Sequence, residues 1–333
     1  MPSSAKLGFV GWVRFGSSFY VRATSADMGV NQSIEKPDVV DGKIDKTVYQ
    51  LGPLEVGGSI SFPGVYELYP STSRSPVAEL WTWALKRSAS GDILPANKNK
   101  SITIKYVDGL AFDYTDSIID SYEFNIAAED VLNITVNVVG RDRLQNTEPA
   151  LSSGEGANLP SYLQKNTRII TWNDVNVNIG GESVSVAANE IRSFTATVAN
   201  NVRRIYTLNS SMAPSLVVPT KRDISGSFTL LGRNSDLGLR SYGYFNASKT
   251  GNETRCTANN TICFGYNTNI ENNSSCSEAW NVQFKDCVVF EIEEMAITND
   301  FFETTVNWHA LPGVNWNDGE DAASTDFVEE CDI

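Results

Sequence analysis

The stretch YEFNIAAEDVLNITVNVV, Tyr122 to Val139, alternates apolar and polar residues on both sides of an acidic pair. A period of two is typical of half-buried β-strands, because successive side chains of a strand point to opposite faces. Glu129 and Asp130 interrupt the alternation and favour a turn. The stretch therefore predicts a β-hairpin with one face in a hydrophobic core and the other in water.

A similar stretch, FEIEEMAITNDFFETTVNWH, spans residues 290–309. Both returning strands contain Thr-Val-Asn, at 135–137 and 305–307, and a Gly-Ser pair followed by an apolar residue lies upstream at 58–60 and 226–228. The offsets are 226 − 58 = 168, 290 − 122 = 168 and 305 − 135 = 170. A nearly constant offset over half of the chain predicts an internal duplication, although chance matches also arise in β-proteins rich in Thr, Val and Asn.

The length and composition of the chain are typical of two globular domains, with 333 residues of which 41% are hydrophobic. A net charge of −14 argues against a surface that grips nucleic-acid phosphates with Lys and Arg. Residues 1–18 lack the continuous apolar core of a signal peptide, and no apolar run approaches the length of a membrane span. We therefore expect a soluble protein without a targeting segment and without a membrane partner.

The expected elements follow one order in both halves: a strand pair, a long polar excursion, a strand, a helix, further strands and the hairpin. Ser75 and Pro76 are the expected N-cap and first residue of the first helix, and a weaker helix is expected near 236–245. The excursions, 25–50 and 199–222, are too long for simple hairpin loops, so we assign them to contacts between stacked subunits.

These elements predict a mainly β fold of two tandem β-sandwich or barrel-like domains, each with one flanking helix. The predicted parts are domain 1, residues 1–145; a linker, 146–166; domain 2, 167–315, with an Asn- and Cys-rich loop insertion at 246–279; and an acidic C-terminal tail, 316–333.

Motifs of catalysis are absent from the sequence, which has no phosphate-binding loop, dinucleotide-binding glycine pattern, metalloprotease motif or nucleophile elbow. A Ser-His-Asp or Cys-His site would depend on His309 alone, and a structural role is the simpler interpretation of a strand-end histidine. Glu291, Glu293 and Glu294 could be the paired carboxylates of a glycosidase, but a solvated strand face is again simpler. We expect no enzyme, no cofactor and no metal site.

Five cysteines lie in the last third of the chain, and their odd number leaves at least one without an intrachain partner. A bridge between Cys256 and Cys263 would close a small Asn-rich loop, although a reducing cytosol disfavours its formation during synthesis. Cys331, on the acidic tail, could be free or could join two chains.

With its duplicated β-units, long excursions and no active site, the chain resembles the tail tube proteins of tailed bacteriophages. The resemblance rests on the Gly-Ser-[Ile/Phe]-[Ser/Thr] strands at 58–61 and 226–229, on the flanking helix, and on the hairpin AEDVLNITVNVVG. It implies that six such domains form a ring whose joined sheets make a continuous β-barrel, and that stacked rings conduct DNA. A chain with two copies resembles the variant in which a trimer makes a pseudo-hexameric ring.

The resemblance further implies a structural virion protein that is assembled in the host cytoplasm. Its partners would be other copies of itself, other tail proteins, and double-stranded DNA that passes through the lumen without sequence-specific binding. Closure between subunits would also remove the exposed sheet edges of two open β-domains. The alternative is a secreted or surface carbohydrate-binding β-sandwich protein, for which aromatic residues, Asn-rich loops and cysteines would be unsurprising.

The polar faces of the two hairpins are the predicted lining of the lumen. They carry acidic and small polar side chains and no Lys or Arg, and this absence would leave a hydrated duplex mobile. The other interpretation is that they are solvated outer faces. The predicted lumen-facing residues are Glu123, Asn125, Asn133, Thr135, Asn137, Glu291, Glu293, Glu303, Thr305 and Asn307.

Overall fold

The protein is mainly antiparallel β-structure, as the sequence predicted. The computed structural model describes residues 10–16, 19–35, 50–67, 76–85, 100–106, 110–146, 167–181, 184–186, 191–208, 211–231, 261–267, 279–284, 287–292, 296–298, 301–310 and 328–329.

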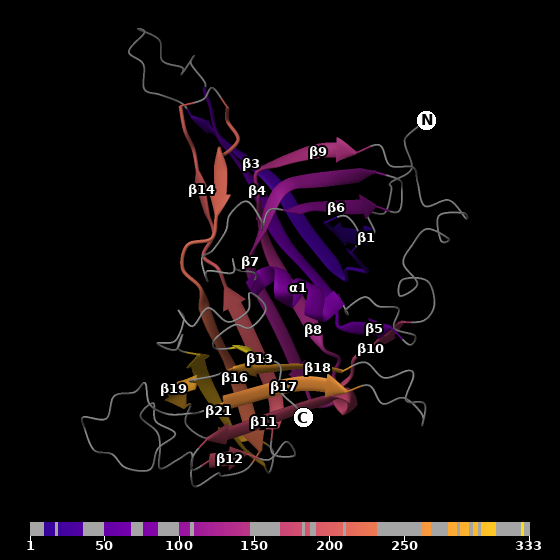
Figure 1. Cartoon of the computed structure of the whole chain (residues 1–333), viewed down its shortest axis with the longest axis vertical. Coiled ribbons are helices and arrows are strands. Elements are labelled where there is room, and N and C mark those ends of the chain that lie inside the picture. The colour runs from indigo at the N-terminus through magenta and orange to yellow at the C-terminus, as the bar shows by residue number, and fades with distance from the viewer. Residues whose placement is uncertain are drawn as a thin grey trace, which may run out of the picture.

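One continuous antiparallel sheet runs through both halves of the chain (Figure 1). Its strands, in spatial order, are β3 (Ser25–Glu35), β4 (Gln50–Pro63), β8 (Asn133–Gly140), β7 (Ala111–Ala127), β13 (Ile191–Ala199), β16 (Asp223–Leu231), β21 (Phe301–Ala310) and an edge made of β19 (Cys287–Ile292) and β20 (Ala296–Thr298). Among the described strands of the single chain this sheet is open and forms no closed barrel. Both halves contribute to one sheet, because β7 of the first half pairs with β13 of the second.

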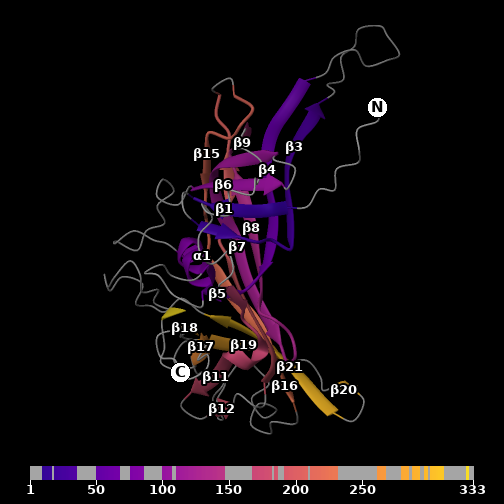
Figure 2. The ribbon, with the colours of Figure 1, turned by 90° about the vertical axis from the view of Figure 1, so that its right-hand side faces the viewer.

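A second layer covers one face of the continuous sheet. Over the first half it consists of β1 (Val10–Phe15), β2 (Phe19–Val21), β6 (Lys100–Tyr106), β9 (Asp142–Asn146) and the first part of β7. Over the second half it is a sheet of β12 (Val184–Val186), β11 (Val175–Gly181), β17 (Thr261–Asn267), β18 (Ala279–Phe284) and β22 (Val328–Glu329). The helix α1 (Pro76–Leu85) lies between these two covers (Figures 1 and 2). A short pair, β5 (Val65–Glu67) and β10 (Thr167–Ile169), precedes the 3-10 turn Trp172–Asp174.

Strand β7 changes layer along its length. Its first part pairs with β6 and β9 in the second layer, and its last part pairs with β8 and β13 in the continuous sheet. Asp116 has a φ of 49°, in the left-handed region that Asp tolerates, and the register with β8 shifts between Ile119 and Ser121. The sequence analysis missed this first part, because its buried residues do not alternate strictly.

The hydrophobic core lies between the two layers and is rich in aromatic rings. Trp81 of α1 packs edge-on against Tyr122 and Phe124 of β7, at ring-centroid distances of 5.4 and 5.5 Å, and against Phe284 of β18 at 5.9 Å. Phe284 in turn packs on Trp308 of β21, with ring centroids 4.9 Å apart. The apolar side chains that alternate in the first hairpin are therefore buried because the helix and the second sheet cover them.

Helix α1 begins at Pro76, where the sequence predicted it. Its buried side chains recur with helical spacing, at Val77, Leu80, Trp81 and Ala84. At the other end of the helix, the carbonyl oxygen of Ala84 accepts hydrogen bonds from side chains of the second half. The helix is thus held by both halves of the chain.

Two expected loops contain strands instead. Residues Thr261–Asn267, inside the predicted Asn- and Cys-rich loop 246–279, form β17, so the prediction of a loop is wrong there: Phe264 is fully buried, and the polar residues around it hid a strand. Likewise Ser25–Glu35, taken as a polar excursion, is the strand β3. Its polar residues are accommodated because it pairs only with β4 among the described strands.

Several predictions fall outside the described residues. They are the linker 146–166 apart from Asn146, which ends β9, the weaker helix near 236–245, Cys256, Cys331 and the tail 316–333 apart from β22. The proposed Cys256–Cys263 bridge therefore stays a prediction. Cys263 lies in β17, in register with Asn178 and Gln283.

Candidate assembly surfaces

The polar faces of the two hairpins belong to one continuous surface, the polar face of the continuous sheet. Backbone pairing sets Asn133, Asn125, Thr195, Ser227, Asn307 and Glu291 in one row across six strands. The rows on either side of it contain buried residues that point into the core. Two stretches 170 residues apart in the sequence thus contribute to one surface, and the second layer covers only the opposite face.

Eight of the ten residues predicted to line a lumen have described side chains, and all eight are at least partly exposed to solvent. They are Glu123, Asn125, Asn133, Thr135, Asn137, Glu303, Thr305 and Asn307. Glu291 is placed by register opposite Asn307, and Glu293 lies outside the described residues. Cross-strand hydrogen bonds order this surface: Thr197 donates to the Glu123 carboxylate at 3.3 Å, and Ser61 and Thr135 share a bond of 3.1 Å.

Two arginines also reach this surface, and the sequence analysis assigned neither of them to it. Arg192 of β13 forms an ion pair with Glu303, so one of the predicted acidic positions has its charge partly offset. Arg204, from the excursion between β13 and β16, reaches the other end of the surface. The hairpins themselves carry no Lys or Arg on their polar positions, but Arg192 and Arg204 bring cations to the same surface, and Arg192 pairs with a carboxylate there.

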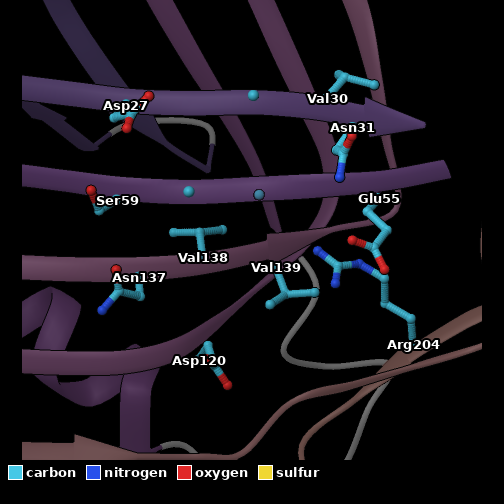
Figure 3. Close-up of a pocket in the computed structure, with 13 residues that line it drawn as sticks. Asp27, Val30, Asn31, Glu55, Ser59, Asp120, Asn137, Val138, Val139 and Arg204 are labelled. Atoms are coloured by element: carbon cyan, nitrogen blue, oxygen red, sulfur yellow. The ribbon is translucent and has the colours of Figure 1, made fainter. Parts of the chain in front are cut away.

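Arg204 lines an open groove of about 600 Å³ at the upper end of the polar face (Figure 3). Its Nη2 donates to the carbonyl oxygen of Val56 at 2.6 Å, and the guanidinium lies beside Glu55 (Figure 3). A Cβ on Gly57 would come within 2.4 Å of the Val138 carbonyl oxygen and 3.3 Å of the Arg204 Nη2. Glycine at position 57 therefore lets the excursion approach the sheet closely.

Residues 200–208 and 211–222 form an arm that contains the hairpin of β14 (Arg203–Ile205) and β15 (Leu216–Val218). The arm lies beside the extended ends of β3 and β4, at the same end of the molecule (Figures 1 and 2). Tyr206 donates its hydroxyl to the Leu54 carbonyl oxygen at 2.9 Å, and the Leu54 amide donates to Met212 at 2.9 Å. Partial burial raises the pKa of the Tyr206 hydroxyl, and Arg204 opposes this rise. These contacts fix the arm of the second half onto the first half.

The two edges of the continuous sheet are β3 and the pair β19–β20. Among the described strands, β3 pairs only with β4, and β19 and β20 pair only with β21. An edge strand with unpaired amides and carbonyls is a template for pairing with another chain. Each copy of the protein therefore presents two such templates.

The described residues meet neither the requirements of a metal site nor those of a membrane-spanning helix. No group of three or more His, Cys, Asp or Glu residues in the described part of the chain could hold a metal ion. None of the helices that the structure describes is long and apolar enough to cross a membrane.

Comparison with known protein families shows to which family the chain belongs. A model of the family described as "Phage tail tube protein" matches residues 16–254, well over half of the chain. The chain belongs to the phage tail tube protein family. No curated protein matches it. The resemblance found in the sequence is thus confirmed, and membership makes this chain a structural component of the virion tail that assembles with itself and with other tail proteins. Membership favours the tail tube interpretation over the alternative of a secreted or surface carbohydrate-binding protein.

Proposed function

We propose that three copies of this tail tube protein close a ring through the edges of their continuous sheets, and that stacked rings form the tube through which DNA passes. One observation carries the proposal: inside a single chain, β7 of the first half already pairs with β13 of the second half along seven residues, from Ser121 opposite Ala199 to Ala127 opposite Ser193. We call such a pairing between the edge strands of two units a joint, and the joint inside the chain is the template for the proposed joint between copies.

The pairing registers of the two halves support their equivalence. In the first half Met28, Gly58 and Val138 are partners, and in the second half Ala196, Gly226 and Trp308 are partners. The offsets between these partners are 168, 168 and 170, the same as those found in the sequence. The irregularity between Ile119 and Ser121 also recurs at an offset of 170, between Val289 and Glu291. We infer that the chain is a duplication in which β13 corresponds to β3 and β19–β20 to the last part of β7.

By this correspondence, β19–β20 of one copy pairs with β3 of the next. Ser121 and Ala199, which face each other inside the chain, correspond to Glu291 and Asn31, which would face each other between chains. Three copies with eight strands each give a barrel of about 24 strands, roughly 45–50 Å across between opposite backbones. Such a ring has no free edge and leaves room for a DNA duplex.

The polar face is the inner face in this proposal. The second layer and α1 cover the opposite face, and their bulk fits outside a closed barrel. Glu123, Asn125 and Asn307 then line the lumen together with the small hydroxyl side chains between them. Carboxylates and hydroxyls hold no phosphates, because they release no counterions from DNA, so the duplex stays hydrated and mobile.

A disulfide between adjacent strands tests the joint, because partners across a strand pair lie within the Cα separation that a disulfide spans. The test variant carries Asn31→Cys and Glu291→Cys. The matched control carries Ser121→Cys and Ala199→Cys at the corresponding positions of the joint inside the chain. Both single variants, Asn31→Cys and Glu291→Cys, report the background from the native cysteines.

After oxidation, we expect the test variant to give dimers and trimers on a non-reducing gel and nothing larger, because a closed ring of three has no further edge. The control should stay at the mass of one chain. Assembled protein that remains uncrosslinked in the test variant would contradict the joint, and a ladder continuing beyond three copies would contradict the trimer.

A further inference from the structure

Exposed apolar side chains gather where the arm projects. Large hydrophobic residues in the described part of the chain are mostly buried, but the arm and the neighbouring tip of β3–β4 expose a group of them. Leu208 is fully exposed, and the others are 38–60% exposed. This group, the apolar tip, consists of Ile34, Leu51, Ile205, Tyr206, Leu208, Met212 and Leu216. A cluster of this kind on a protein surface marks an interaction site.

A second exposed apolar pair lies at the opposite end of the strands. Trp172 is 47% exposed and Ile169 is 43% exposed. Trp172 donates its amide hydrogen to the Asp130 carbonyl oxygen at 3.0 Å, so it lies beside the turn that joins β7 to β8. The arm contacts Val56, which pairs with Gly140 at the other end of β8. The eight residues of β8 separate the two sites by roughly 25 Å.

We propose that the apolar tip of one copy docks on the Trp172 and Ile169 surface of a copy in the next ring. The inference rests on the proposed ring, because only a closed barrel places the two ends of the strands on its two rims. The tip then projects from one rim and the Trp172 surface lies on the other. A contact between two different surfaces of the same protein repeats without closing, and therefore builds a filament of rings that all point the same way.

The chemistry of the two surfaces favours this pairing over contact between two tips. Two tips facing each other would give an isologous contact, which ends after two rings and builds no tube. A tryptophan that is half-exposed offers a large apolar surface to leucine and methionine side chains. With three arms on each ring, every junction between rings contains three such contacts.

Two substitutions separate stacking from ring closure. Leu208→Asp places a charge in the apolar tip, and Trp172→Asp places one on the opposite rim. Leu144→Asp is the matched control, because Leu144 is 54% exposed on β9 and belongs to neither of the two apolar surfaces. We expect each test variant to form trimers by native mass spectrometry and to raise the concentration needed for stacking by at least roughly 1000-fold, since loss of one buried leucine or tryptophan costs about tenfold at each of three contacts.

Mixing the two variants gives the sharpest outcome. Leu208→Asp rings keep an intact Trp172 surface, and Trp172→Asp rings keep an intact tip, so one junction can form between them. The other two faces of that pair are both defective. An equal mixture of preformed rings should therefore give stacks of two rings and no longer ones, as counted by negative-stain electron microscopy.

Other results overturn the inference or its basis separately. Normal tubes from Trp172→Asp rings, or a mixture that forms no two-ring stacks, would show that the tip does not dock on the Trp172 surface. Loss of trimers in these variants would instead contradict the proposed ring. Trp172→Ala removes the indole side chain without adding a charge. It therefore distinguishes the loss of an apolar contact from charge repulsion, and it should also weaken stacking.

Discussion

Asn200 is a buried residue that connects the two halves and the helix, and its replacement tests this packing directly. The side chain is only 3% exposed. Its Nδ2 donates to the carbonyl oxygens of Ala84, at the end of α1, and of Ile119 in β7, both at 2.9 Å. Its Oδ1 accepts from the Nε of Arg222 at 3.0 Å. The amide side chain thus connects the first half, the helix and the base of the arm.

Asn200→Ala removes all three bonds in a buried place. The Ala84 oxygen keeps a donor, because Arg222 Nη2 also reaches it at 3.3 Å, but the Ile119 oxygen and the Arg222 Nε each lose the hydrogen bond that Asn200 makes. Loss of its hydrogen bond by a buried polar group costs about 1–3 kcal/mol, and two groups are affected, so we expect the free energy of unfolding to fall by about 2–6 kcal/mol. Such a loss is a large share of the stability of an ordinary domain.

Urea denaturation of the unassembled protein measures this loss as a lower midpoint with an unchanged slope. The control is Asn137→Ala, which removes an exposed side chain with one bond, to Ser121 at 2.7 Å, and should cost less than about 1 kcal/mol. Asn200→Asp keeps the size of the side chain but replaces the Nδ2 donor with an oxygen that faces the carbonyl oxygens of Ala84 and Ile119. This variant should lower the free energy of unfolding at least as much as Asn200→Ala. If the free energies of unfolding of both Asn200 variants lay within about 1 kcal/mol of that of the control, the hydrogen bonds of Asn200 would not stabilise the fold as argued.

Three further predictions test the sheet, the core and the lumen. Gly226→Ala should prevent folding or lower the melting temperature strongly, because a Cβ there would lie 2.0 Å from a carbonyl oxygen of the neighbouring strand, whereas Gly29→Ala, with no atom within 4 Å, should be neutral by thermal melting. Burial raises the pKa of the Tyr122 hydroxyl, so the unfolded chain loses a proton above about pH 10 that the folded chain retains. Above about pH 10 the free energy of unfolding should therefore fall by up to about 1.4 kcal/mol per pH unit because of this group. Urea denaturation at pH 9 and pH 11 should show a smaller fall in Tyr122→Phe, which lacks the hydroxyl. Glu291→Lys with Glu293→Lys should leave rings and tubes intact but slow DNA ejection from particles, and ejection at the normal rate would contradict a lumen at these positions.

The sequence predicted the elements whose signals are local. The alternation from Tyr122 to Val136 follows burial, since Tyr122, Phe124, Leu132, Ile134 and Val136 are fully buried and the polar residues that alternate with them are not. The turn forms where Glu129 and Asp130 interrupt the pattern, and Glu129 adopts a positive φ of 70°. Pro76 at the first position marked the helix for a similar reason, because its fixed φ and missing amide suit that position.

Features that depend on distant parts of the chain could not be predicted in this way. Pairing of β7 with β13 joins residues about 70 positions apart, and neither strand encodes its partner in its own alternation. The sequence does not predict the strand β17, because the residues around it are rich in Asn and Cys. Its position in the sheet depends on the packing of Phe264 against Phe124 in the core. Arg204 reaches the polar face across roughly 150 residues of sequence, through a close approach that Gly57 permits.

A duplicated chain changes the energetics of forming the proposed ring. A six-unit ring has six joints between units, and association of separate chains at each joint costs translational and rotational entropy, estimated at 4 to more than 15 kcal/mol. Covalent connection turns every second joint into an intramolecular one, which the β7–β13 pairing already satisfies in each copy. Only the three joints between β19–β20 and β3 remain for assembly. In the proposed duplication the two halves are also free to differ, so that the second half carries the arm proposed to contact the next ring and the first half supplies the sheet that supports it.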